Sequence, residues 1–281
     1  MNQPIFSVCI ITFRRPALLK QCLDRLAPER QVLPSHLYEV IVSDDCPDAS
    51  ARPTVQEFSF ARWIQGPSQG IAANRNHVAR ASLADWIVFI DDDELPSPDW
   101  LAQIYELVRS GSWDVIEGRV EPIDYPDSIL WYAPMVRSAG MFCTANLAIK
   151  REQFFSVGGF DERLRTSHED IELGQRIKAA GLRSCFLESA CVLHPARRIS
   201  FSQVLKRTIQ QQCQSYLLPN RKNKTGWRSS PTIVVWSLKY LVRTFRMQTS
   251  VEGFSRWRSL LMGAVIRTFC CPFACIRIIC S

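Results

Sequence analysis

The stretch Trp86-Ile-Val-Phe-Ile-Asp-Asp-Asp-Glu94 decides the fold that the sequence predicts. Its five apolar residues form a short, uninterrupted run, which is typical of a strand buried on both faces of a sheet. Four acidic residues follow that run directly. In α/β sheets, ligands bind beyond the carboxyl ends of the strands. This acidic segment is therefore where we first expect chemistry.

The same alternation of apolar runs and amphipathic stretches extends outward from this segment. Strands are expected over residues 6–11, 38–42, 62–64 and 86–90, with helices from Pro16 and over residues 70–83. Further strands are expected near residues 114–120, 146–149 and 185–193, and a helix that begins at a Ser167 cap and ends before Gly181. This order predicts an α/β fold with a mostly parallel sheet and helices on both faces.

Charge divides the chain into two parts. Residues 1–194 hold 19 Lys and Arg against 26 Asp and Glu, a net charge of −7, whereas residues 195–281 hold 15 against the single acid Glu252, a net charge of +14. We therefore expect a catalytic domain at residues 1–195 and a basic, aromatic helical region at residues 196–281. Basic side chains interrupt the apolar stretches of that region, which favours lying at a membrane surface over crossing the membrane.

The cysteines and the N-terminus indicate the compartment. The 11 cysteines are scattered and odd in number, and no secretory signal precedes the first expected strand. This pattern is typical of a reduced, cytoplasmic chain. With the basic C-terminal region, it predicts a cytoplasmic protein bound peripherally at the inner face of the cell membrane.

Asp91 and Asp93 are the first candidate metal ligands. Alternate residues that leave a strand point the same way, so the two carboxylates are expected side by side. Such a pair suits Mg²⁺ or Mn²⁺, which prefers oxygen ligands and commonly bridges a protein carboxylate to substrate phosphates. The alternative is a solvated acidic turn that caps the next helix, whose start the segment Pro96-Ser-Pro98 marks.

Polar residues also follow the other expected strands. Thr12 and Arg14 come after the first strand, and Asp44 and Asp45 come after the second. Because parallel strands end at the same edge of a sheet, these residues are expected beside the acidic segment. For the aspartate pair, an ordinary Asp-rich turn is the alternative.

Five segments resemble, in order, the successive motifs of glycosyltransferase family 2. They are FSVCIITFRRP (6–16), YEVIVSDDCPD (38–48), GIAANRNHVARASLADWIVFIDDDELP (70–96), MFCTANLAIKREQFFSVGGFDE (141–162) and HEDIELGQRIKAAG (168–181). The resemblance implies the GT-A fold, which is Rossmann-like. It also implies an inverting, metal-dependent transferase that moves a sugar from a nucleoside-diphosphate sugar to an acceptor hydroxyl.

The resemblance assigns nucleotide and metal contacts. The acidic triplet is similar to the family's DxD element, so Asp91 and Asp93 are expected to bind metal and diphosphate, with Asp92 beside them. Asp44 and Asp45 match the element that contacts the nucleotide base, although Cys46-Pro47 replaces its usual Gly-Ser continuation. The remaining positions that match nucleotide-sugar contacts are Thr12, Arg14, Gly70, Asn74 and Arg75.

The resemblance also assigns a catalytic base. His168-Glu-Asp170 is similar to the family's ED motif, so Asp170 is expected to deprotonate the acceptor hydroxyl, and Glu169 to assist. The alternative is a capping box, because Ser167 and Asp170 have the spacing of one. His194, at the end of a strand, is similar to a histidine that completes the metal site in some relatives, and it is otherwise a strand-end residue.

Two rival functions are considered beside the transferase. A nucleotidyltransferase of nucleotide-sugar synthesis predicts an early Gly-rich phosphate loop, whereas no glycine precedes Gly66. A non-enzymatic protein that binds membranes or nucleic acid through its basic residues predicts that loss of Asp170 changes nothing. We expect the transferase, with Mg²⁺ or Mn²⁺, a glycan or lipid-linked acceptor in envelope or polysaccharide synthesis, and no nucleic-acid partner. No motif encodes the donor sugar, the linkage or the oligomeric state.

Overall fold

The computed structural model describes residues 3–126, 131–200 and 203. The chain divides into two compact units, one of residues 1–124 and 133–195 and one of residues 125–132 and 196–281. Most of the basic region predicted at residues 196–281 lies outside the described residues. Its helices and its membrane contact therefore stay predictions.

The expected strands correspond to β1, β2, β3, β4, β6, β8 and β9, and the expected helices to α1, α3 and α6. The strands are β1 (Phe6–Thr12), β2 (Tyr38–Asp44), β3 (Ala61–Gln65), β4 (Trp86–Asp91), β5 (Leu95–Pro96), β6 (Val115–Ile123), β7 (Trp131–Tyr132), β8 (Leu147–Lys150), β9 (Ser184–Pro195) and β10 (Arg197–Arg198). The helices are α1 (Pro16–Leu26), α2 (Arg52–Gln56), α3 (Ile71–Ala81), α4 (Trp100–Arg109), α5 (Arg151–Ser156) and α6 (Glu169–Ala179), with a 3₁₀ turn η1 (Ser35–Leu37).

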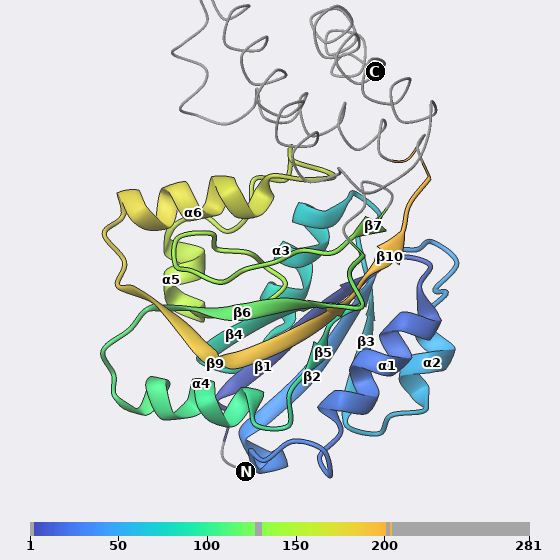
Figure 1. The fold of residues 1–281 in the computed structure, drawn as a ribbon, viewed down its shortest axis with the longest axis horizontal. Helices are drawn as coiled ribbons and strands as arrows, with labels where there is room; N and C mark the ends of the chain where they lie inside the picture. Colours follow the sequence, from blue (N-terminus) through green and yellow to red (C-terminus); the bar gives the residue numbers. More distant parts are fainter. Residues whose placement is uncertain (1–2, 127–130, 201–202, 204–281) are drawn as a thin grey trace, which may run out of the picture. The chain divides into compact units, whose positions relative to one another are not determined.

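Eight strands of the first unit form one sheet in the order β3-β2-β1-β4-β8-β6-β9-β5 (Figure 1). The strands β3, β2, β1 and β4 are all parallel, as predicted. Beyond β4 the sheet is mixed, because β8 and β5 run antiparallel to their neighbours. The chain goes from β1 outward to β2 and β3 and then returns to β4 on the other side of β1. Such a switch point is where ligands bind in open α/β sheets.

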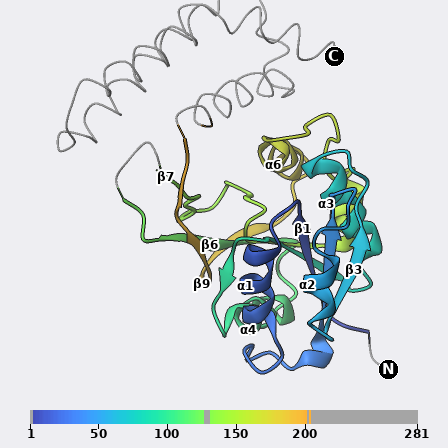
Figure 2. The same ribbon diagram turned by 90° about the vertical axis from the view of Figure 1, so that its right-hand side faces the viewer.

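Alternate residues of the central strands build two cores, one on each face of the sheet. One core joins Phe6, Val8 and Ile10 of β1 to α1, α2 and α4. The other joins Cys9 of β1 and Phe89 of β4 to α3, α5 and α6. The sheet is therefore covered by helices on both faces (Figures 1 and 2), which confirms the predicted α/β architecture.

The structure confirms the predicted C-terminal cap of α6 and contradicts its predicted N-terminal cap. Gly181 follows the helix with φ +67°, and the N–H groups of Gly181 and Leu182 donate to the carbonyls of Lys178 and Ile177. This is the glycine C-cap that was predicted. The N-cap residue, however, is His168 in a left-handed conformation, with no side-chain cap hydrogen bond. The predicted Ser167 cap is wrong, because the Ser167 hydroxyl lies 2.9 Å from Nδ1 of His168 instead.

Candidate active site

The acidic segment turns sharply where β4 ends. The strand stops at Asp91, and the N–H of Glu94 donates to the carbonyl of Asp91 at 3.2 Å. The alternation of a strand therefore does not extend to Asp93, and the two carboxylates have different partners. Asp91 Oδ1 lies 2.6 Å from Nη2 of Arg75, whereas Asp93 Oδ2 lies 2.7 Å from Nη1 of Arg15.

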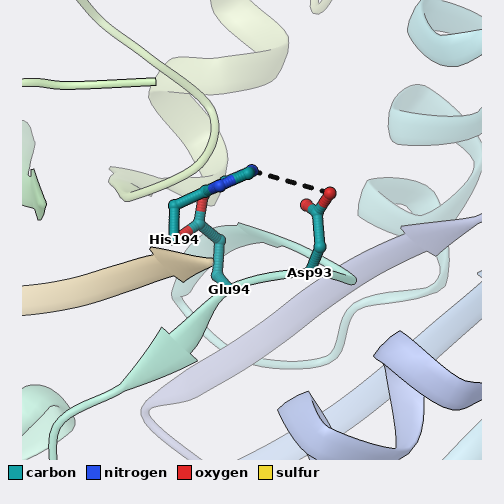
Figure 3. Close-up of side chains that lie close together, drawn as sticks. All are labelled: Asp93, Glu94 and His194. Carbon is teal, nitrogen blue, oxygen red and sulfur yellow. Dashed lines mark ion pairs between the residues drawn. The ribbon is translucent and has the colours of Figure 1, made fainter. Parts of the chain in front are cut away.

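Asp93, Glu94 and His194 form a group that could hold a metal ion (Figure 3). One ligand atom of each residue lies within 4.8 Å of the others. The pairing of β5 with β9 explains the group, because Leu95 is opposite Leu193 in the antiparallel register and Glu94 thus comes to His194. Nε2 of His194 lies 3.6 Å from Oδ2 of Asp93. Asp91, a predicted metal ligand, is not in this group.

Glu94 shows that the group is chemically suited to a cation. Its side chain is fully buried, and neither carboxylate oxygen has a hydrogen-bond partner among the described residues. Burial, with the charges of Asp91 and Asp93, raises the pKa of Glu94 well above its ordinary value. An unpartnered buried carboxylate is costly unless it is neutralised or coordinates a metal. The two carboxylates supply the oxygen ligands that Mg²⁺ and Mn²⁺ prefer, and the imidazole adds a nitrogen ligand, which suits transition metals better than Mg²⁺.

Asp92 is held by the residues that follow β1. The hydroxyl of Thr12 donates to its Oδ2 at 2.7 Å, and Nη2 of Arg15 lies 2.9 Å from its Oδ1. Burial raises the pKa of Asp92 to about 7, although Arg15 opposes that rise. The exits of β1 and β4 are thus joined directly, as the sequence predicted. The structure places Thr12 and Asp92 in contact with each other.

Three consecutive polar residues of α3 each hold a different element at the site. The Asn74 side chain exchanges hydrogen bonds with Ser43 of β2, and the Asn76 side chain exchanges them with the backbone of Phe160. Between them, Arg75 is buried and pairs with both Asp91 of β4 and Glu169 of α6. Helix α3 therefore fixes the distance between the acidic segment and the start of α6. Asn74 and Arg75, predicted to contact nucleotide, are occupied by protein partners.

Asp170 and Glu169, the predicted catalytic carboxylates, lie in the first turn of α6. Glu169 is buried, and burial raises its pKa to about 7 against the opposing effect of Arg75. Asp170 is half-buried, and its Oδ1 accepts a hydrogen bond from the N–H of Ile171 at 2.7 Å. Burial again raises the pKa of Asp170, and the charge of Asp91 adds to the rise. A raised pKa suits a carboxylate that must accept a proton near neutral pH.

Asp44 and Asp45 fix two loops at the end of β2. Asp44 is fully buried, and its two oxygens accept hydrogen bonds from the N–H groups of Cys46 and Ala51 at 3.0 and 2.7 Å. The two oxygens of Asp45 accept from the N–H groups of Ser68 and Gly70 at 2.7 and 3.0 Å. All four carboxylate oxygens thus accept hydrogen bonds from backbone N–H groups. Base recognition by either residue stays a prediction.

Gly70 and Arg14 border the same edge. Gly70 precedes α3 with φ +101°, and a Cβ atom there would lie 2.6 Å from the carbonyl oxygen of Arg165. Only glycine fits this entry to the helix. Arg14 is mostly exposed, and its guanidinium contacts Sγ of Cys46 at 3.4 Å and Asp48 at 3.0 Å. It is therefore near the loop after β2, as a contact to a nucleotide bound there would require.

The sequence prediction did not assign roles to Glu94, Arg15 or Asn76. Glu94 stood in the acidic segment, but the signal that identifies it is the pairing of β5 with β9, which no local pattern encodes. Arg15 carried a usable signal, because it follows β1 and precedes a helix-starting proline. Asn76 belongs to the polar run Asn74-Arg-Asn76, whose buried positions on a helix indicate structural hydrogen bonds.

Comparison with known proteins identifies the family. The family model described as glycosyl transferase family 2 matches residues 7–171, which is more than half of the chain. The chain belongs to glycosyl transferase family 2. Its similarity to an uncharacterized glycosyltransferase of Haemophilus influenzae is 26% identity over 60% of each chain. The succinoglycan biosynthesis protein ExoM of Rhizobium meliloti is 32% identical over 43% of this chain and 40% of its own length.

Other relatives of this family 2 chain extend the pattern. The N-acetylglucosaminyl-diphospho-decaprenol L-rhamnosyltransferase of Mycobacterium tuberculosis is 30% identical over 45% of this chain and 41% of its own length. The chain thus spans 40 to 60% of the length of these three curated relatives. Homologues of the chain act in polysaccharide and envelope glycan synthesis.

Solved structures confirm the GT-A fold. The mannosyltransferase PcManGT from Pyrobaculum calidifontis, in complex with GDP-Man and Mn²⁺, has a TM-score of 0.59 at 16% identity and covers 98% of this chain and 73% of its own. TarS of S. aureus, residues 1–349, in complex with UDP, has a TM-score of 0.57 at 17% identity and covers 94% of this chain and 87% of its own.

Proposed function

We propose that this family 2 chain is an inverting, metal-dependent transferase of a hexosyltransferase type, which uses a nucleoside-diphosphate sugar. The observation that carries the proposal is the chain of contacts from Asp91 through Arg75 to Glu169. It connects the acidic segment, which includes the metal-binding candidates Asp93 and Glu94, to the helix turn that bears Asp170. A metal site and a general base held at a fixed separation are what a displacement at an anomeric carbon requires.

The residues of the site account for the chemistry. Asp93, Glu94 and His194 would hold the divalent cation, Mg²⁺ or Mn²⁺, which would neutralise charge on the diphosphate leaving group. Asp170 accepts the proton of the acceptor hydroxyl while that oxygen forms a bond to the anomeric carbon. The bond from that carbon to the diphosphate breaks on the opposite side, and its electron pair leaves with the diphosphate. The configuration at the anomeric carbon is therefore inverted.

The donor site lies at the exits of β1 and β2. Thr12, Arg14, Asp44 and Asp45 all belong to this edge, and Gly70 brings the start of α3 to it. GDP-Man is bound by one structural neighbour and UDP by another, which supports a nucleotide donor for this chain. The relatives in succinoglycan and decaprenol-linked glycan synthesis support a polysaccharide or lipid-linked acceptor.

A membrane location is a separate proposal. Among the described residues, no helix combines the length and apolar character needed to cross a membrane. The net charge of +14 over residues 195–281 supports peripheral binding to an anionic surface. A cytoplasmic enzyme bound to the inner membrane face would meet lipid-linked acceptors there.

The test is binding and turnover over a panel of UDP-, GDP- and dTDP-sugars, with and without Mn²⁺. We expect one donor to bind only with metal, and Asp93→Ala to abolish that binding. Asp170→Asn should bind the donor normally but lose turnover by about 10²–10⁴-fold, as removal of a general base does. Asp24→Asn, which changes an exposed carboxylate on α1, is the control and should match the wild type.

Two results would overturn the proposal. If no donor binds with any metal, the site does not bind a nucleotide sugar. If the product retains the anomeric configuration of the donor, as read from its proton coupling by NMR, then Asp170 is not acting as base in a single displacement.

A further inference from the structure

Arg15 follows β1, beside the acidic segment, and has no role in the proposed transfer reaction. Its Nη1 lies 2.7 Å from Oδ2 of Asp93, and its Nη2 lies 2.9 Å from Oδ1 of Asp92. Its side chain is 36% exposed, whereas that of Arg75, which also pairs with the acidic segment, is 7% exposed. Arg15 thus contacts a metal-binding candidate directly and retains access to solvent.

The contact of Arg15 with Asp93 competes with a metal ion. Oδ2 of Asp93 is the oxygen that faces Nε2 of His194 at 3.6 Å, on the side where the metal-binding candidates converge. A divalent cation at Asp93 would repel the guanidinium and weaken its hold on this oxygen. The anion that arrives with that cation is the diphosphate of the donor. A guanidinium freed beside the metal meets that diphosphate.

We propose that Arg15 is a diphosphate-binding residue, which the free enzyme holds on Asp92 and Asp93 and which transfers to the donor when metal and nucleotide bind. The proposal rests on the proposed function, because it needs a nucleoside diphosphate at this site. Before binding, Arg15 lowers the charge repulsion among the carboxylates. After binding, its planar fork donates two hydrogen bonds to phosphate oxygens, a geometry that Arg favours.

Arg75 and Arg14, two other described arginines at this edge, are less suited to bind the diphosphate. Arg75 is buried between Asp91 and Glu169, and its release would leave two buried carboxylates without a cation. Arg14 pairs with Asp48 beside the loop after β2, which is the side predicted for the base. Arg15 can leave its partners at a smaller cost, because Thr12 still donates to Asp92 and the incoming metal replaces it at Asp93.

The test measures two affinities in the full chain, that for Mn²⁺ alone, by electron paramagnetic resonance, and that for Mn²⁺ with UDP, GDP or inorganic pyrophosphate, by calorimetry. In Arg15→Gln, we expect the affinity for Mn²⁺ alone to rise, since a competing cation is gone. The affinity for the diphosphate should fall about 10–100-fold, the scale of hydrogen bonds to charged groups. Opposite signs of the two changes are the signature of the proposal.

Two further variants complete the comparison. Arg109→Gln removes the same charge from an exposed site on α4 and should change neither affinity. Arg15→Lys retains the charge without the fork, so its diphosphate affinity should lie between those of the wild type and Arg15→Gln. It also serves if Arg15→Gln fails to fold, because a lysine can still neutralise Asp92.

The outcomes separate the two proposals. If wild-type protein binds neither Mn²⁺ nor any of the three diphosphates, the proposed function fails, and the role of Arg15 fails with it. If the wild type binds both but Arg15→Gln loses Mn²⁺ and diphosphate together, Arg15 only supports the acidic segment. If neither Arg15→Gln nor Arg15→Lys changes the affinity for the diphosphate, Arg15 does not contact the donor. Each of the last two results overturns the role of Arg15 and leaves the transferase intact.

Discussion

Carboxylates at opposite ends of the sheet have pKa values that are shifted in opposite directions. At the carboxyl end of β4, burial raises the pKa of both Asp92 and Glu94 above their ordinary values. At the other end, Asp114 precedes β6 and meets Lys150 at 2.9 Å and Arg183 at 3.0 Å. There the hydrogen bond from Arg183 lowers the pKa of Asp114 to well below its usual range, and Lys150 adds to the effect.

The difference separates a functional cluster from a structural one. Asp114 has two cations for a single carboxylate, so its charge is satisfied within the protein. At the β4 end, the described residues place two arginines, Arg15 and Arg75, beside four consecutive acids, and give neither buried oxygen of Glu94 a hydrogen bond. Carboxylates in such a site are suited to bind a cation or a proton. Substitutions at the two ends should therefore differ in their effects on stability and on ligand binding.

The largest effect should follow from removing Arg75. Arg75→Met leaves the carboxylates of Asp91 and Glu169 without their shared cation, so the free energy of unfolding should fall by about 3–5 kcal/mol. Urea unfolding, followed by circular dichroism, measures the change. Adding Glu169→Gln should recover part of the loss, because one of the two stranded charges is then removed.

The matched control for Arg75 is Arg80→Met, on the same helix. Arg80 is 60% exposed and pairs with Glu162 at 3.2 Å at the surface. Its loss should cost less than about 1 kcal/mol. Equal costs for the two variants would contradict the view that Arg75 is a buried bridge between β4 and α6.

A smaller effect is expected from Glu94→Gln, and it should separate metal binding from stability. The affinity for Mn²⁺ should fall by at least about 10–100-fold, the cost of losing a residue that only supports a ligand, because here a direct ligand loses its charge. The free energy of unfolding without metal should not fall, since the carboxylate has no hydrogen bond to lose among the described residues. Calorimetric titration and thermal unfolding with and without Mn²⁺ measure both quantities.

Glu106→Gln, an exposed change on α4, provides the reference for Glu94. If Glu94→Gln destabilises the metal-free protein and leaves the affinity for Mn²⁺ unchanged, Glu94 is part of the framework. The contrast between the two ends of the sheet would then be lost.

The central sheet could be predicted because its strands carry strong local patterns. Each of β1, β2 and β4 contains at least three consecutive apolar residues, Pro16 marks the start of α1, and Gly181 follows the end of α6. The polar residues that follow parallel strands were correctly placed at one edge. These features depend on the sequence near each residue and on one general property of parallel sheets.

The partners within the site could not be predicted in the same way. β5 has two residues and no periodicity, yet its pairing with β9 brings Glu94 to His194. Asn74 and Arg75 were matched to nucleotide contacts. In the structure, Asn74 instead bonds to Ser43, and Arg75 pairs with Asp91 and Glu169, which a single sequence does not show. Metal and donor roles at these positions stay predictions, because they depend on tertiary distances and ligands.

The smallest effect is expected from replacing Asp114, the carboxylate at the other end of the sheet. Its pKa is lower in the folded protein than in the unfolded chain, so its ion pairs stabilise the fold at neutral pH. This contribution is present above the unfolded pKa of about 3.9 and is lost as the pH falls through that value toward the folded pKa. Asp114→Asn should therefore lower the free energy of unfolding by about 1 kcal/mol at pH 7, since Arg183 is half-exposed and solvent weakens its pair.

The difference in the free energy of unfolding between Asp114→Asn and the wild type should become smaller below about pH 4. Urea unfolding between pH 3 and 7 measures it, with Asp24→Asn as the exposed control. Donor affinity should be unchanged, because Asp114 lies at the end of the sheet away from the site. A loss of donor affinity in Asp114→Asn would show that the two ends are coupled.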